Sequence, residues 1–359
     1  MNREKRRVIA MILLAVYFLV LIGIFMSFSI STVESDSDPL NLFFRQLIYV
    51  GIGTLVLLFF SFFNYVHFKK LSKIMLIALF ISLFLVEGPV AGRWIYIPFT
   101  TFAIQPSQFA PVVLTIFIAK IFSNPIDEKT SKKVYFLVFA IIILVSALVV
   151  FQPDFGSGFI IFGTAMLLLF ITGVPISYYL LFLAVSLAGA LGALSFSAEW
   201  RNRILAFFNP AAYYDTDAMQ GLQALRALSR GGITGAGFMH SILKFPGHLP
   251  EGSSDFIFAI MGEEMGLIGC TVIIVVFLLF TYFSFRLSLR AKSSFARILG
   301  VGLTIDIVGW ATVNMLVNVG LIPTTGVPLS FISFGGNNMV ANLMSVGILI
   351  NIIRQEVEI

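Results

Sequence analysis

The sequence contains few charged residues. Asp, Glu, Lys and Arg make up 11% of the 359 residues, whereas soluble domains carry about 25%. There is one cysteine, Cys270, which excludes a disulfide within the chain and leaves the redox compartment open. Hydrophobic residues account for 58% of the chain. This composition excludes an ordinary soluble domain and favours a protein that folds in lipid.

Long apolar runs recur along the whole chain. Runs of about 20 residues can cross a hydrocarbon core of about 30 Å, and these runs lack the alternation of barrel strands. The sequence therefore predicts an all-α, polytopic membrane protein, with residues 1–359 forming a single domain. The ten predicted transmembrane helices cover residues 8–30, 43–63, 71–87, 106–122, 134–152, 156–172, 176–198, 256–285, 297–320 and 331–353.

The basic residues predict the orientation of these helices. If the N-terminus is cytoplasmic, 16 of the 23 Lys and Arg residues fall in cytoplasmic segments, as the positive-inside rule requires. Both termini are then cytoplasmic. The first apolar run is longer than the core of a signal peptide, so we expect it to remain as a span.

One connection is long. Residues 199–255 form an extracytoplasmic loop between spans seven and eight, and this loop is rich in Phe, Leu and Ala. Within it, DAMQGLQALRALSR (217–230) spaces its apolar residues as an amphipathic surface helix does. Thr216 or Asp217 could cap this helix, and Gly231-Gly232 would end it. Long structured loops often carry function.

The loop ends in EGSSDFIFAIMGEE (251–264), which holds four carboxylates in front of an apolar run. Two interpretations of Asp255 compete. It could cap the eighth helix, or it could be a general base at the edge of an outward cavity, since carboxylates entering a span often mark a site. We interpret Glu263 and Glu264 as mainly structural.

Other candidates lie in the predicted outer segments. Asp154, in FQPDFGSG, is either a turn residue or a ligand of substrate or cation. Arg93 is either an interfacial anchor or a phosphate-binding group, and Gln105 and Ser107 would line the same pocket. Arg201, Arg203 and Lys244 are basic residues on the face where basic residues are disfavoured. They either reach lipid headgroups or bind an anionic substrate.

Polar residues also occur within spans nine and ten, where we expect hydrogen bonds between helices. They are Asp306, Asn314, Asn318, Asn337, Asn338 and Asn342. Asp306 is the one most open to a proton-relay role. The glycine-rich piece GGITGAGF (231–238) lacks the spacing of a nucleotide fingerprint, and the sequence shows no HExxH or CxxC metal motif.

Seven motifs in order resemble the SEDS proteins, the FtsW/RodA/SpoVE family of membrane glycosyltransferases that build peptidoglycan. The motifs are GRW (92–94), QPSQFA (105–110), QPDFGSG (152–158), RNRILAFFNP (201–210), the Gln220–Gly237 stretch, LPEGSSDFIFAIMGEEMGLIG (249–269) and LIPTTGVPLSFISFGGNN (321–338).

The chain departs from the family pattern at some positions. Gln108 and Pro111 stand where the family usually has Glu and Lys. The last motif differs at Ser330, Phe334, Asn337 and Asn338, and Ser253-Ser254 replace His-Thr before the key Asp. Within the family, LQALRALSRGGITGAGF followed by Ser241 and Lys244 is more similar to the FtsW version than to that of RodA.

The resemblance implies a reaction. The family polymerises lipid II, a disaccharide-pentapeptide on undecaprenyl pyrophosphate, by joining C1 of the growing chain to the 4-hydroxyl of the next GlcNAc. Asp255 matches the essential acidic residue of the family and would be the catalytic base, with Glu251 supporting it. The leaving pyrophosphate needs stabilisation, which Arg or a divalent cation (Mg²⁺ or Mn²⁺) gives; no cofactor beyond that is implied.

The resemblance also implies a location in the bacterial cytoplasmic (inner) membrane. It implies partners as well: a class B penicillin-binding protein with transpeptidase activity, and other divisome membrane proteins. Nucleic acid is not among them. Three alternatives stay open from the sequence. They are a lipid II flippase, a RodA-type polymerase for elongation rather than division, and a division scaffold that only recruits a transpeptidase.

Overall fold

A computed structural model describes residues 3–34, 40–86, 92–96, 103–125, 128–196, 198–213, 218–245, 249 and 251–357. Ten of its helices lie at the ten predicted ranges: α1 (Arg3–Glu34), α2 (Asn41–Phe62), α3 (Val66–Leu85), α4 (Ala110–Phe122), α5 (Glu128–Phe151), α6 (Phe155–Ile171), α7 (Ile176–Phe196), α10 (Ile257–Leu289), α11 (Ser294–Asn318) and α12 (Gly336–Glu356).

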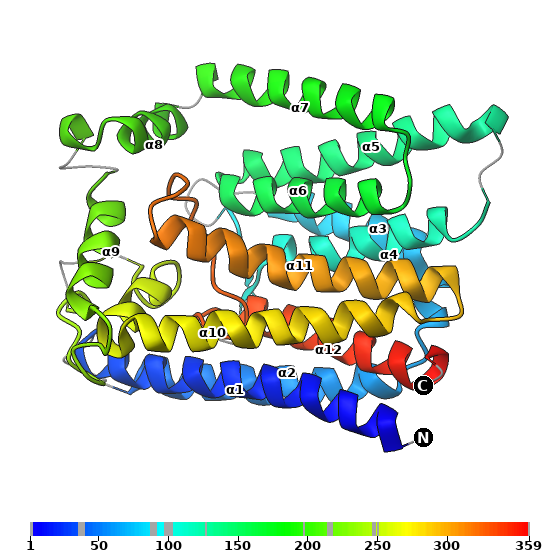
Figure 1. Cartoon of the computed structure of the whole chain (residues 1–359). Coiled ribbons are helices and arrows are strands. Elements are labelled where there is room, and N and C mark those ends of the chain that lie inside the picture. Colours follow the sequence, from blue (N-terminus) through cyan, green and yellow to red (C-terminus); the bar gives the residue numbers. More distant parts are fainter. Residues whose placement is uncertain are drawn as a thin grey trace.

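These helices form a bundle that crosses a membrane several times. Six of them, α1, α2, α5, α10, α11 and α12, are long and apolar enough to span, and α4, α6 and the first part of α7 are shorter apolar helices. Both termini lie at one end of the bundle, and α8 and α9 lie at the other end (Figure 1). The fold is therefore a polytopic helical membrane protein, while the count of ten crossings stays a prediction.

The long loop is structured, as expected. It contains α8 (Ala198–Phe208), the short 3₁₀ helix η2 (Pro210–Tyr213) and α9 (Ala218–Gly231). The amphipathic helix predicted over 217–230 is thus confirmed as α9, which ends where Gly232 adopts a φ of 54°. Its proposed caps, Thr216 and Asp217, lie outside the described residues.

The structure corrects two boundaries. The region before α4 is not a helical span from residue 106, because it forms a hairpin of β1 (Ile95–Tyr96) and β2 (Ala103–Ile104) followed by the 3₁₀ helix η1 (Pro106–Gln108). The all-α prediction therefore misses this small sheet. Residues 331–335 are apolar but not helical, since Phe331 has a φ of 65° and α12 begins only at Gly336.

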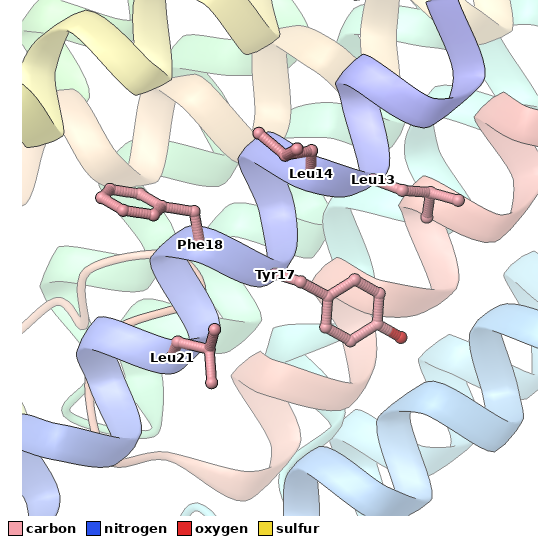
Figure 2. Close-up of a pocket in the computed structure, with 5 residues that line it drawn as sticks. All are labelled: Leu13, Leu14, Tyr17, Phe18 and Leu21. Carbon is pink, nitrogen blue, oxygen red and sulfur yellow. The ribbon is translucent and has the colours of Figure 1, made fainter. Parts of the chain in front are cut away.

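The core has two main parts. One joins α1, α10, α11 and α12, and the other joins α3 to α6. A pocket of about 400 Å³ lies on the flank of α1. Figure 2 shows its lining residues: Leu13, Leu14, Tyr17, Phe18 and Leu21. Its one polar side chain, Tyr17, donates its hydroxyl to Thr54 on α2 at 3.1 Å. This apolar pocket has the chemistry of a lipid contact rather than of a catalytic site.

Candidate active site

Asp255 lies in a tight turn just before α10. The carbonyl oxygen of Glu251 accepts the backbone N–H groups of Ser254, Asp255 and Phe256 at 3.2, 2.9 and 3.3 Å, with Glu251 itself at a φ of 57°. The N-cap of α10 is Phe256, and no side chain caps the helix. The expectation that Asp255 caps this helix is therefore wrong. Its carboxylate is left available for other contacts.

Two asparagines of α11 hold this turn in place. The side-chain amides of Asn314 and Asn318 both donate to the carbonyl oxygen of Asp255, at 2.8 and 3.0 Å. Asn318 also accepts the backbone N–H of Ala259 at 3.0 Å, in the first turn of α10. The predicted hydrogen bonding between helices is confirmed here, and its effect is to fix the backbone that carries Asp255.

Two glycine contacts bring the start of α6 beside Asp255. Gly326 has a φ of 70°, and a Cβ added there would lie 3.3 Å from Oδ2 of Asp255. One residue earlier, the carbonyl of Thr325 packs so closely on Gly156 that no side chain fits there. The 324–327 segment is therefore sandwiched between the turn of Asp255 and the first turn of α6.

Asp154 caps α6 and is buried. Its Oδ1 accepts the backbone N–H of Ser157 at 3.2 Å, and its Oδ2 accepts the amide of Gln105 at 3.1 Å. Nearby, Arg93 donates to the carbonyl oxygens of Gln152, at 3.2 Å, and of Pro153. The structure thus brings Arg93 and Gln105 together around Asp154. The sequence predicts one pocket for Arg93 and Gln105, but it does not predict their contact with Asp154.

Ser107 follows Gln105 in the buried turn η1. Its side chain is 1% exposed, and its hydroxyl has no hydrogen-bond partner within the described part of the chain. A buried hydroxyl without a partner is uncommon. It remains a candidate binding group.

The electrostatics of the two aspartates follow from their surroundings. Burial raises the pKa of Asp255 to about 7, and the charge of Glu251 adds to this, while the Ser254 hydroxyl and the charge of Arg203 act in the opposite direction. Burial also raises the pKa of Asp154, and the nearby guanidinium of Arg93 counteracts part of the rise. A carboxylate with a pKa near 7 is suited to general base catalysis at neutral pH.

Two of the basic candidates lie on α8. Nη1 of Arg203 lies 3.5 Å from the carbonyl oxygen of Thr324, in the segment that packs on Asp255. Arg201, two residues earlier, is exposed. Trp200 packs on Phe155 at the start of α6, with ring centroids 4.3 Å apart. This contact holds α8 beside the two aspartates.

Lys244 lies in a different group. Its Nζ is 3.7 Å from Oε1 of Glu264, and it donates to the Ser29 hydroxyl and to the Met239 carbonyl at 3.1 and 2.7 Å. The side chain is 2% exposed. The structure therefore separates Lys244 from the cluster around Asp255, although the sequence placed it among the substrate-binding candidates.

Glu263 is likewise occupied by protein groups. It accepts the Ser241 hydroxyl and the backbone N–H of Ile242, the latter at 3.2 Å, and it pairs with Arg230 at 3.4 Å. This agrees with the structural interpretation of Glu263 and Glu264. The carboxylate of Asp306 is a third buried case, since it accepts the Thr115 hydroxyl at 2.7 Å between α11 and α4.

Sequence reasoning did not assign a role to the 324–327 segment or to Asn314 and Asn318 at this site. The 324–327 segment belongs to one of the sequence motifs, and the two asparagines are polar residues within a predicted span. All of them lie far from Asp255 in the sequence, so the sequence does not indicate that they are its neighbours. Among the described residues, no group of three or more His, Cys, Asp or Glu side chains could hold a metal ion.

Comparison with known proteins adds relatives of nearly equal length. The model of a family described as "Cell cycle protein", labelled for FtsW, RodA and SpoVE, matches residues 9–358. Stage V sporulation protein E of Bacillus subtilis (strain 168) is 32% identical over 366 residues, with 99% of each chain covered. "Probable peptidoglycan glycosyltransferase FtsW" of Geobacter sp. (strain M18) is 33% identical over 352 residues, with 95% of each covered.

Two solved structures share the fold. The rod shape determining protein RodA of Thermus thermophilus matches with a TM-score of 0.69 at 21% identity, over 97% of both chains. A chain from "Structural coordination of polymerization and crosslinking by a peptidoglycan synthase complex" matches with a TM-score of 0.75 at 22% identity, over 94% of this chain and 96% of that one.

Proposed function

The chain belongs to the FtsW, RodA and SpoVE family, and we propose that it is a peptidoglycan glycosyltransferase that polymerises lipid II, with Asp255 as the general base. The enzyme class rests on relatives that bear this name at about 30% identity over nearly the whole chain. A role in cell division fits the FtsW name of those relatives. The observation that carries the role of Asp255 is its rigidly held turn, which leaves the carboxylate uncapped beside Asp154 and Arg203.

The proposed reaction has one bond forming and one breaking. The 4-hydroxyl of the acceptor GlcNAc attacks C1 of the growing glycan, and Asp255 accepts the hydroxyl proton. The C1–O bond to undecaprenyl pyrophosphate breaks with inversion from α to β. The leaving group carries its electrons and negative charge towards the arginines, and Arg203 on α8 is placed to stabilise it. Arg201 and Arg93 add positive charge at the edges of the site.

The supporting groups have separate tasks. Asn314 and Asn318 fix the position of the Asp255 backbone, and Asp154 with Gln105 presents hydrogen-bonding groups beside it. Burial of Asp255, together with the charge of Glu251, raises its pKa to about 7, so that it can accept a proton near neutral pH. Asp154 would be the residue to hold a divalent cation against the pyrophosphate. The steps given above use only the protein's own residues.

We propose that the prenyl chain lies along α7. Phe182 packs on Phe139 with ring centroids 4.0 Å apart, but beyond it Leu183, Leu187 and Leu191 are 45, 60 and 58% exposed. Figure 1 shows this half of α7 leading to α8, which carries Arg203. An apolar chain lying along α7 would place its pyrophosphate near α8.

We propose that the site faces the outside of the cytoplasmic membrane. The distribution of basic residues favours cytoplasmic termini, and the site lies at the other end of the bundle. The partners would be a class B penicillin-binding protein, which crosslinks the product, and other divisome membrane proteins. These assignments follow from family membership and from the location of the site at the end of the bundle opposite the termini.

The function is tested by reconstituting the purified chain with its penicillin-binding protein and lipid II, and measuring glycan polymer. Wild-type protein should make polymer, and Asp255→Asn of equal thermal stability should make none. Transport of labelled lipid II by wild-type protein in vesicles, without polymer, would instead establish a flippase. Normal growth of cells that carry only Asp255→Asn would favour the scaffold.

A further inference from the structure

Residues 232–245 lie between α9 and the turn of Asp255, and their charged side chain, Lys244, points into the protein. The Lys244 side chain is 2% exposed and pairs with Glu264, which is 0% exposed. The hydroxyl of Ser241 donates to Glu263, which is 1% exposed. Ser241 and Lys244 are therefore bound to α10 and to the end of α1, while Thr234 and His240 of the same segment are exposed.

The opposite side of the same segment is apolar and exposed. A loop in water normally shows the reverse arrangement, with charges outside. The exposed apolar side chains are Ile233 at 68%, Phe238 at 46%, Met239 at 37%, Ile242 at 40% and Phe245 at 46%. Such an inverted segment is matched to an apolar environment rather than to water.

At residues 232–237 the backbone of this segment meets the requirement that lipid imposes. Non-helical backbone is tolerated at membrane depth only when its N–H and C=O groups are satisfied by protein. α10 is broken at Gly266, whose φ of 66° and ψ of −169° interrupt the helix. Residues 232–237 pair with the groups that the break frees, through the following bonds: Ala236 N–H to Glu263 O at 2.8 Å, Gly237 N–H to Glu264 O at 3.1 Å, Leu267 N–H to Gly232 O at 2.9 Å and Ile268 N–H to Ile233 O at 3.1 Å.

The position of the break places the segment at the edge of the hydrocarbon core. About 20 helical residues cross about 30 Å, so a span that starts near Arg286 of α10 reaches the far boundary near Gly266. Leu267 and Ile268, just inside that boundary, are 63 and 56% exposed. Phe238 contacts Phe25 of α1 edge to face, with centroids 6.3 Å apart, so the exposed apolar side continues the lipid-facing surface of α1 and α10.

We propose that residues 233–245 are inserted into the membrane leaflet opposite the termini, as a re-entrant element whose partner is the lipid itself. The inserted segment ties the chain before Glu251 to the bilayer. It therefore holds the turn of Asp255 near the level of the lipid headgroups, where a pyrophosphate-linked lipid carries its sugar. The insertion itself does not depend on the proposed glycosyl transfer.

Spin labelling tests the insertion without disturbing the buried contacts. In a Cys270→Ala background, single labels would be placed by Ile242→Cys and Phe238→Cys, with the full chain in phosphatidylglycerol–phosphatidylethanolamine nanodiscs. Leu14→Cys on α1, where Leu14 is 73% exposed, serves as the lipid reference. Ala212→Cys in η2, where Ala212 is exposed, serves as the water reference. The readout is the ratio of collisions with oxygen to collisions with a water-soluble nickel chelate.

Insertion predicts a collision ratio at residues 242 and 238 several-fold above that at 212 and close to that at 14. A ratio equal to that at 212 would overturn the proposal. The proposal would also be overturned if residues 242 and 238 were accessible to water in the chain alone and became protected only when a single-span transpeptidase was added. This surface would then be a protein docking site. The ratio should be unchanged by Asp255→Asn, which separates this proposal from the proposed activity.

Discussion

The four carboxylates of residues 251–264 divide into two pairs with opposite surroundings. Glu251 is exposed and Asp255 half-buried, in a turn that two asparagines hold by its backbone. Glu263 and Glu264 are only 1% and 2% exposed, and they bind Arg230, Ser241, Lys244 and Ser29. The first pair can contact a ligand, whereas the carboxylates of the second pair bind other groups of the protein.

The comparison shows that the partners of a carboxylate decide its role, more than its neighbours in sequence. Glu264 lies nine residues after Asp255, yet its partners come from α1 and from the 232–245 segment. The second pair secures the loop that carries the first. Substitutions should therefore separate the two pairs, with stability lost from one and activity from the other.

The largest effect on stability is expected from breaking the buried pair. Lys244→Met should lower the free energy of unfolding by about 3–5 kcal/mol, since it leaves Glu264 buried without its countercharge. The double variant Lys244→Met/Glu264→Gln should lose less than Lys244→Met alone. Thermal unfolding in nanodiscs measures this, and a double variant less stable than Lys244→Met would contradict it.

A smaller loss of stability, with a clear loss of activity, is expected from Asn318→Leu. It removes hydrogen bonds to the carbonyl of Asp255 and the N–H of Ala259, at a cost of about 1–3 kcal/mol. Asn342→Leu is the matched control, because it removes the bond to Asn338 at 2.8 Å in α12 without touching the turn. Polymer per folded molecule should fall more in Asn318→Leu, and an equal fall in both would argue against a positioning role.

The pH dependence should distinguish the residues around Asp255. As the base, Asp255 must be deprotonated, so polymerisation should fall as the pH drops through about 7. Glu251→Gln removes a negative charge that raises this pKa, so the midpoint should move to lower pH. Arg203→Gln removes a charge that lowers it, so the midpoint should move to higher pH. Each shift should be below about one unit because solvent screens these charges, and identical midpoints in the two variants would contradict the assignment.

The smallest effect is expected at Arg201. It is exposed, whereas Arg203 reaches the 324–327 segment beside Asp255. Arg201→Gln should lower polymerisation by less than about threefold, as for a solvated charge, and Arg203→Gln should lower it more. Steady-state rates at saturating lipid II measure this, and a reversed order would place the pyrophosphate at Arg201.

The sequence predicts the helices well because the length of an apolar run is a local property. It fails at residues 331–335, where the run is apolar but Phe331 adopts a positive φ and Phe334 N–H donates to Ser253 O at 3.0 Å. Hydropathy cannot separate a buried turn from a helix. The predicted start of the last span is early for this reason.

The site is predicted in part. Asp255, Asp154, Gln105 and Arg93 are found through motifs, and the structure brings them to one end of the bundle. Lys244 looked like a surface cation because its partners Ser29 and Glu264 are distant in sequence. The contacts of Asp255 with Asn314 and Asn318 are likewise separated by about 60 residues, so no local pattern could have assigned them.

The most direct test compares amide variants of both pairs in one assay: Asp255→Asn, Glu251→Gln, Glu263→Gln and Glu264→Gln. Lipid II polymer would be measured per folded molecule with the penicillin-binding protein present. The account predicts no polymer from Asp255→Asn and measurable polymer from each of the other three once folded protein is matched. Polymer from Asp255→Asn equal to wild type would contradict the central claim and move the search for the base to Asp154.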